Sequence, residues 1–133
     1  MKIWKGFGSE HSANMVLIGH FKDVQSATET KKLIEEFQEV VEASRDAGEF
    51  DVGQHPEDYP EKVLQFVSEH NFHPNPKDLE DVLYDYTMDQ SECDIKIHTE
   101  EQAFQFFINA MIRKGAKIEV FSAHDYKCEF TRL

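Results

Sequence analysis

The chain has 133 residues and carries 14 Lys and Arg against 26 Asp and Glu, a formal net charge of −12. This length suits one domain with a core of its own, and a hydrophobic content of 40%, with 12% aromatic residues, excludes a disordered tail. The negative charge disfavours direct binding to nucleic acid, because the phosphate backbone repels carboxylates.

The sequence shows no targeting segment. The first ten residues, MKIWKGFGSE, lack the apolar stretch and the small-residue cleavage site of a signal peptide. The longest plainly apolar run, MVLI, is far shorter than the roughly 20 residues of a membrane helix. We therefore expect a cytoplasmic protein, in which the two cysteines, Cys93 and Cys128, are reduced thiols.

Two strands are predicted before the first helix. Residues 2–7 (KIWKGF) alternate between apolar and polar side chains, and residues 12–22 (SANMVLIGHFK) form an apolar run typical of a central strand. A helix then begins at Asp23 or Ser26, because Ser26 and Glu29 have the spacing of a capping box, and it ends at Gly48.

Two further helices are predicted in the middle of the chain. A loop stiffened by Pro56 and Pro60 leads to a helix over about residues 60–70. The next helix starts at Asn75, with Pro76 in the favoured first helical position, and its apolar positions extend to Tyr86.

The last third has the clearest pattern. Residues 93–98 (CDIKIH) alternate and predict a strand. A capping box formed by Thr99 and Gln102 opens a buried helix over residues 103–114 (AFQFFINAMIRK). Gly115 ends this helix. Residues 117–123 and 126–132 predict two more strands, joined as a hairpin.

These elements predict one α+β domain spanning residues 1–133. We expect a mixed β-sheet of about five strands, in the order ββ-α-αα-β-α-ββ, with the helices packed on one face. The order resembles a ferredoxin-like split βαβ arrangement with a helical acidic insertion at about residues 49–90. Such a resemblance of architecture carries no function by itself.

Negative charge is concentrated in the middle of the chain. Residues 35–94 contain 18 acidic and three basic residues, a net charge of −15, whereas the remainder has 11 basic and eight acidic residues, a net charge of +3. Charge segregated in this way creates a field with a direction. The first helix carries acidic residues at steps of four, three and four, which form one stripe: Glu35, Glu39, Glu42 and Asp46. The third predicted helix carries a second stripe: Asp78, Asp81, Asp85 and Asp89.

The segment EFDVGQHPEDYPE, residues 49–61, connects the two stripes and adds carboxylates around two aromatic rings. Like charges four residues apart destabilise a helix by roughly 0.2–0.5 kcal/mol per pair, yet lysines are almost absent here. Aromatic rings among carboxylates can supply anchors as well as electrostatic steering. A merely solvated acidic face is the alternative, and the sequence leaves both open. The predicted partner-binding residues are Glu35, Glu39, Glu42, Asp46, Phe50, Asp51, Asp58, Tyr59, Asp78, Asp81 and Asp85.

Metal binding is the first alternative chemistry. Two Cys/His pairs could bind zinc, but the first pair lies five residues apart on a strand and its side chains point to opposite faces. A histidine pair at a helix end, His70 and His73, lacks a completing carboxylate, and the acidic run at residues 89–100 lacks the glycine of a calcium loop. We predict no metal site and no cofactor. The zinc candidates are Cys93, His98, His124 and Cys128.

A small enzyme is the second alternative. The segment GFGSEHS offers two glycines, Gly6 and Gly8, followed by a serine and His11, with His20 on the next strand. The third glycine of a dinucleotide fingerprint is missing, and no helix follows. The sequence leaves enzymatic activity open and assigns no catalytic residue.

The leading hypothesis is a non-catalytic, acidic protein-binding module that docks on or inhibits a basic macromolecule, such as a nuclease or a nucleic-acid-binding protein. In size, acidity and α+β composition the chain is similar to bacterial immunity proteins and antitoxins. A closely related hypothesis is a DNA mimic, in which carboxylates imitate phosphates. Both imply fast association that weakens as salt rises, and the oligomeric state stays open.

Overall fold

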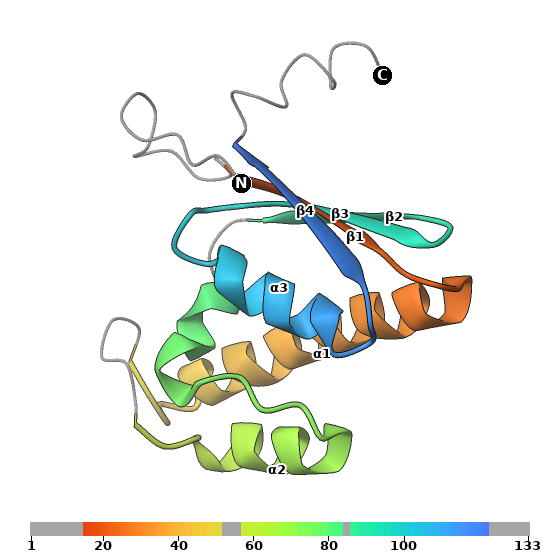
Figure 1. Cartoon of the computed structure of the whole chain (residues 1–133). Coiled ribbons are helices and arrows are strands. Elements are labelled where there is room, and N and C mark those ends of the chain that lie inside the picture. Colours follow the sequence, from red (N-terminus) through yellow and green to blue (C-terminus); the bar gives the residue numbers. More distant parts are fainter. Residues whose placement is uncertain (1–14, 52–56, 84–85, 123–133) are drawn as a thin grey trace.

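The computed structural model describes residues 15–51, 57–83 and 86–122, without the side chains of Lys77 and Asp78. Within these ranges it contains four strands, three α-helices and one 3-10 helix, η1. Figure 1 shows the sheet on one side and the helices together on the other. The elements in chain order are β1 (Met15–His20), α1 (Val24–Asp46), α2 (Glu61–His70), η1 (Pro76–Leu83), β2 (Thr87–Ser91), β3 (Asp94–Thr99), α3 (Phe104–Ile112) and β4 (Lys117–Ser122).

The sheet has the strand order β2-β3-β1-β4, and every neighbouring pair is antiparallel. The expectation of a mixed sheet is therefore wrong, and the expected five strands are not confirmed. Three of the expected strands are present as β1, β3 and β4. The other two, at residues 2–7 and 126–132, lie outside the described residues. Strand β2 was not predicted.

The central strand β1 divides its side chains between the two faces of the sheet. Leu17 lies opposite Ile97 of β3 and Val120 of β4, and these side chains face the helices. Ile18 and His20 point to the opposite, outer face, because side chains alternate along a strand. The apolar run of β1 thus supplies apolar side chains to both faces at the centre of the sheet.

The helix α1 begins and ends at signals that the sequence carries. The carboxylate of Asp23 accepts a hydrogen bond from the backbone N–H of Ser26 at 2.7 Å, so Asp23 rather than Ser26 is the N-cap. At the other end, Gly48 adopts φ +76°, and its N–H donates to the carbonyl of Arg45. A side chain would be strained at this φ, which explains why the helix stops at a glycine.

Two helices differ from the expectation. The predicted third helix is a short 3-10 helix, η1, and its three-residue turn changes which side chains share a face. The helix α3 begins at Phe104, and Ala103 precedes it without a side-chain cap, so the capping box predicted at Thr99 and Gln102 is not formed. Among the described helices, none has the length and hydrophobicity to cross a membrane.

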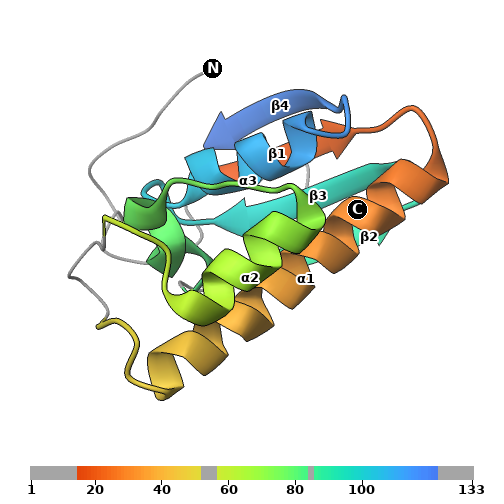
Figure 2. The same ribbon diagram turned by 90° about the horizontal axis from the view of Figure 1, so that it is seen from below.

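The core lies between the sheet and the helices, and Phe37 of α1 is at its centre. Its ring is fully buried and packs against Phe66 of α2, Phe72 after α2 and Phe106 of α3, with centroid separations of 5.7, 5.4 and 5.5 Å. Figure 2 shows α1 and α2 side by side, in front of the sheet in this view from below. One aromatic side chain thus joins three separate segments.

We expect Phe37→Ala to lower the free energy of unfolding by about 3–5 kcal/mol, because it removes a buried ring and leaves a cavity between three other rings. Phe37→Leu should cost less, since it keeps most of the volume. Urea denaturation followed by circular dichroism measures both. A loss below about 1 kcal/mol for Phe37→Ala would contradict this account of the core.

Candidate protein-binding surface

The predicted acidic stripe of the first helix is present on the outer side of α1. Residues at steps of four, three and four fall on one helix face, and this face lies away from the buried positions such as Ile34 and Phe37. Glu35, Glu39 and Asp46 are exposed, and Glu42 is half-buried. We call this set of four carboxylates, Glu35, Glu39, Glu42 and Asp46, the acidic ridge.

The ridge is only partly neutralised by neighbouring cations. Lys31 Nζ lies 3.0 Å from Glu35, and Arg45 Nε lies 3.4 Å from Asp46. Both pairs are largely exposed, so they contribute little energy and restrain their side chains weakly. Glu39 and Glu42, in the middle of the ridge, form no ion pair within the described part of the chain. The centre of the ridge is therefore its most negative part.

One aromatic residue lies beside the ridge. The hydroxyl of Tyr86 donates a hydrogen bond to Gln38 of α1, and its ring packs against Phe107 at 4.8 Å. Burial, together with the Glu35 and Glu42 carboxylates, raises the pKa of Tyr86 to about 12. Tyr86 thus lies close to the ridge through its contact with Gln38.

More carboxylates gather where α1 ends and α2 begins. Glu49 accepts a hydrogen bond from Ser44 at 2.9 Å and lies 3.8 Å from Lys62 Nζ, which brings the two helix ends together. Asp51 and Asp58 are exposed on the segments next to these ends. The predicted residues Asp51 and Asp58 thus add negative charge near the C-terminal end of the ridge.

The two aromatic residues predicted as anchors are not exposed. Phe50 is buried, with 8% of its surface exposed, and belongs to the hydrophobic core. Tyr59 is half-buried against the same core, and its hydroxyl donates to the carbonyl of Pro74. Burial also raises the pKa of Tyr59. Both rings therefore stabilise the fold, which corrects their interpretation as exposed anchors.

The second predicted stripe does not form an α-helical row. Asp78 and Asp81 fall on η1, whereas Asp89 lies on β2. Asp81 is half-buried and has a partner within the protein. Asp85 and the side chain of Asp78 lie outside the described residues. The neighbouring Glu80 is buried. Of the two predicted stripes, only the ridge of α1 forms an α-helical row within the described residues.

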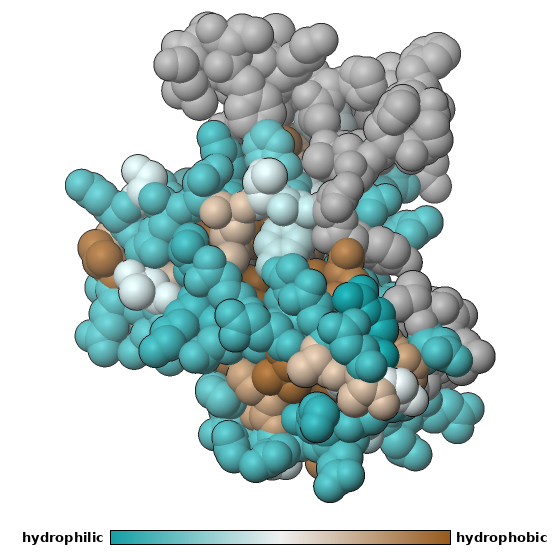
Figure 3. All heavy atoms as spheres, turned by 180° about the vertical axis from the view of Figure 1, so that it is seen from behind, coloured by the Kyte–Doolittle hydropathy of each residue, from teal (hydrophilic) through white to brown (hydrophobic). Residues whose placement is uncertain are grey.

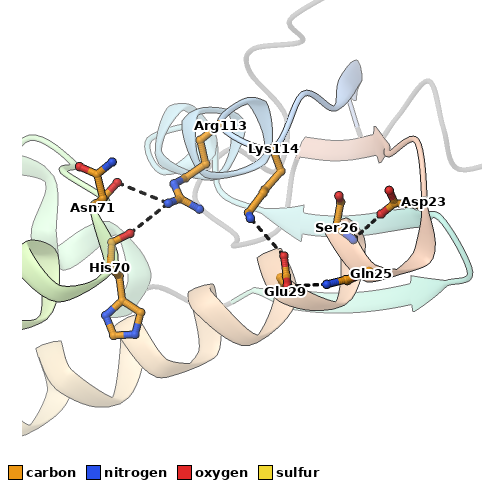
Figure 4. Close-up of polar contacts among 8 residues, drawn as sticks. All are labelled: Asp23, Gln25, Ser26, Glu29, His70, Asn71, Arg113 and Lys114. Carbon is orange, nitrogen blue, oxygen red and sulfur yellow. Dashed lines mark hydrogen bonds and ion pairs between the residues drawn. The ribbon is translucent and has the colours of Figure 1, made fainter.

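Two cations at the end of α3 are engaged elsewhere, as Figure 4 shows. The Arg113 guanidinium donates to the backbone carbonyls of His70 and Asn71 at 3.0 and 3.4 Å, and it lies over the ring of Phe72. These carbonyls end α2 and lack helical partners, so Arg113 caps that helix. Lys114 pairs with Glu29 at 3.1 Å and lowers its pKa.

Two shallow hollows flank Arg113. The first has a volume of about 330 Å³ and the second about 260 Å³. The first is lined by Glu29, Lys32, Leu33, Glu36, His70, Arg113 and Lys114. The second is lined by Asn71, Phe72, His73, Pro74, Asn75, Asn109 and Arg113. Two of the three positive side chains at the first hollow already have partners within the protein.

His20, the residue on which the enzyme alternative depends, lies on the outer face of the sheet between two carboxylates. Its Nδ1 is 2.9 Å from Asp94 of β3, and its Nε2 is 2.6 Å from Glu119 of β4. Hydrogen bonds to Glu119 and Asp94 raise the pKa of His20. Both ring nitrogens are occupied, which suits a charged imidazolium that links three strands.

Acidic and basic side chains are mixed on this outer face. His20 lies between Asp94 on one neighbouring strand and Lys117 on the other, and Asp89 lies opposite Lys96 in the next row. Opposite charges on neighbouring strands stabilise a sheet, so this face is internally balanced. The acidic residues of this face are Asp89, Asp94 and Glu119, and the basic residues are His20, Lys96 and Lys117.

The remaining candidates do not form a metal centre within the described residues, where no group of three or more ligating side chains is close enough to hold an ion. Cys93 is a free, half-buried thiol before β3, and His98 lies on the outer face. His70 stacks on Phe66 at the end of α2, and its Nδ1 lies 3.0 Å from the backbone carbonyl oxygen of Phe66. The residues Gly6, Gly8, His11, His55, His124 and Cys128 lie outside the described residues.

The chain belongs to DUF6375, a family of unknown function, which matches residues 1–132. No curated protein and no solved structure matches the chain. The family description names no activity and no partner, so the function has to be inferred from the residues and their geometry.

We expect NMR titration of His20 to give a pKa above the ordinary histidine value of about 6.5. The pKa of His98 should lie below that value, because burial and the charge of Lys96 lower it. Asp94→Asn and Glu119→Gln should each bring the pKa of His20 down. Because the folded-state pKa is raised, the stabilisation by His20 is complete below the unfolded-state pKa and is lost as pH rises through the folded-state pKa. If neither substitution changes the pKa of His20, its contacts with Asp94 and Glu119 do not link the three strands.

Proposed function

We propose that this DUF6375 protein is a non-catalytic binding module whose acidic ridge docks on a basic protein and inhibits or anchors it. The observation that carries the proposal is the pair Glu39 and Glu42, which lie at the centre of a row of four carboxylates without an ion pair inside the described chain. Like charges so close on one helix cost stability, at roughly 0.2–0.5 kcal/mol per pair. A cationic partner would offset this cost.

The mechanism follows from the placement of the charge. A negative ridge attracts a basic partner over several ångströms and orients it before contact, which raises the association rate. Asp51 and Asp58 extend the field at one end of the ridge. Contacts at the ridge then determine the lifetime of the complex, since differences in affinity arise mostly from dissociation.

Two kinds of basic partner fit this surface. An immunity-type or antitoxin-type protein would cover the Lys- and Arg-lined site of a nuclease, whereas a DNA mimic would occupy the DNA-binding face of another protein. In the second case, duplex DNA competes for the captured partner. In the first case, the ridge blocks an active site, and enzymatic activity of the partner is lost on binding.

The enzyme alternative rests on His20, because its other residues, His11 and the Gly6–Gly8 loop, lie outside the described residues. A general base needs a free ring nitrogen to accept a proton from a substrate. Both nitrogens of His20 contact carboxylates. The binding function is therefore the better supported of the two.

We also propose that the fold is ferredoxin-like, with α2 and η1 as a helical insertion. The support is the chain order β1-α1-β2-β3-α3-β4 once these two helices are set aside, together with the sheet order β2-β3-β1-β4. This arrangement places the ridge of α1 on the helical side of the molecule.

We expect Glu39→Gln/Glu42→Gln to weaken capture of a basic partner about tenfold, since each exposed charge contact is worth roughly 0.2–1 kcal/mol. Affinity for the wild-type protein should fall as ionic strength rises. The matched control is Asp89→Asn/Glu92→Gln, which removes the same charge from strand β2 and its turn and should leave binding unchanged. Affinity capture from native cells, followed by equilibrium titration of the captured protein, measures all three.

An acidic captured partner, or an affinity that is independent of salt, contradicts the proposal. Equal losses in the ridge variant and in the control would show that only total charge matters. In that case the position of the carboxylates on α1 has no role in recognition.

A further inference from the structure

A groove runs between α1 and α2, beside the acidic ridge. It has a volume of about 240 Å³, and its apolar lining comes from Val40 and Ala43 of α1 and from the ring of Phe66. We call it the α1–α2 groove. Its lining residues are Val40, Ala43, Lys62, Gln65, Phe66 and Glu69. Figure 3 shows the molecule from behind, with apolar surface between hydrophilic bands in the lower part of the view, where α1 and α2 lie.

The polar side chains of α2 at the groove have partners within the protein. Gln65 donates a hydrogen bond to Glu69 at 3.4 Å, and Lys62 Nζ lies 3.8 Å from Glu49. These contacts hold the polar ends of the side chains to one another along the rim. They leave the apolar lining for an incoming apolar side chain.

The ridge borders the groove along α1. Glu39 lies one helical turn before Ala43, and Asp46 lies three residues after it, so both carboxylates are within a turn of the groove. Glu69 is exposed on the α2 side. The groove therefore combines an apolar floor with a predominantly negative rim.

We propose that the α1–α2 groove receives one apolar side chain from a basic amphipathic helix of the partner, while the lysines and arginines of that helix contact the acidic ridge. This inference rests on the proposed function and specifies the partner. Charge complementarity favours a basic helix, because three carboxylates, Glu39, Asp46 and Glu69, lie at or near the rim of the groove. A cavity of roughly 150 Å³ holds a benzene ring, so the groove has room for a leucine or phenylalanine side chain.

A helix is the suitable shape for this occupant. The helices α1 and α2 pack side by side (Figure 2), and both line the groove. Amphipathic helices bind hydrophobic grooves through apolar residues at helical spacing. A second copy of this chain is disfavoured, because it carries a net charge of −12 and would bring a second acidic surface against the first.

The test uses two synthetic peptides of equal charge, each of about five helical turns. One carries lysines and a leucine stripe at helical spacing, and the other has serine in place of every leucine. Isothermal titration measures the binding of each peptide to the full chain. We expect the leucine peptide to bind at least about tenfold more tightly, because it buries an apolar side chain that the serine peptide lacks.

Two variants separate the groove from the ridge. Ala43→Gln places a polar amide in the groove without changing the charge and should abolish the preference for the leucine peptide. Glu39→Gln/Glu42→Gln should weaken both peptides by the same factor and keep their ratio. Val24→Gln, an apolar-to-polar change at an exposed position at the other end of α1, is the control and should change neither affinity. Methyl NMR shifts of Val40 on addition of the leucine peptide provide a second readout that needs no variant.

The outcomes distinguish the two proposals. If the ridge variant weakens both peptides but Ala43→Gln keeps the preference for leucine, the groove inference is wrong and the proposed function stands. If the ridge variant changes neither affinity, the proposed function fails. Sedimentation that shows a dimer, together with Ala43→Gln variants that dissociate it, would assign the groove to a second copy and overturn the inference.

Discussion

The rotational position of α1 about its own axis is the constraint on which the proposed surface depends. Phe37 is held by rings from α2, from the segment after it and from α3. Glu35 and Glu39 are two residues before and after Phe37, which places each about 160° away around the helix. They cannot turn inward unless Phe37 leaves the core, and that costs several kcal/mol, roughly what a large-to-small substitution costs. The packing of one ring therefore keeps the carboxylates outside.

The basic side chains near the helices contact groups other than the carboxylates at the centre of the ridge. Arg113 caps α2, Lys114 pairs with Glu29, and Lys62 lies against Glu49. Each of these cations links two segments: Arg113 joins the ends of α3 and α2, Lys114 joins the end of α3 to α1, and Lys62 joins the start of α2 to the residues after α1. The local demands of helix capping thus help to explain why Glu39 and Glu42 have no partner within the described chain.

The sequence predicts some features well because they depend on local periodicity. The stripe on α1 follows from a period of 3.6 residues, and the glycine that ends the helix follows from its positive φ. Strand β2 was missed because Met88 is its one strongly apolar residue, and an edge strand needs no continuous apolar pattern. Phe50 and Tyr59 were misread because whether an aromatic ring lies inside or outside depends on tertiary packing, which spacing alone does not reveal.

The outer face of the sheet gives the strongest internal comparison for the acidic ridge. There, three acidic and three basic side chains lie on one face, and His20 is held between Asp94 and Glu119. The same chain thus balances its charges where neighbouring strands allow it. On α1, a lysine four residues from Glu39 or Glu42 would be equally simple in sequence, yet positions 35, 38, 43 and 46 are Glu, Gln, Ala and Asp. The acidic ridge therefore lacks the balance of the outer face of the sheet, and it adjoins a groove with an apolar lining. Repulsion between carboxylates is tolerable on an exposed surface, where the Debye length is about 8 Å, and the attraction of a cationic helix lying against them would offset it.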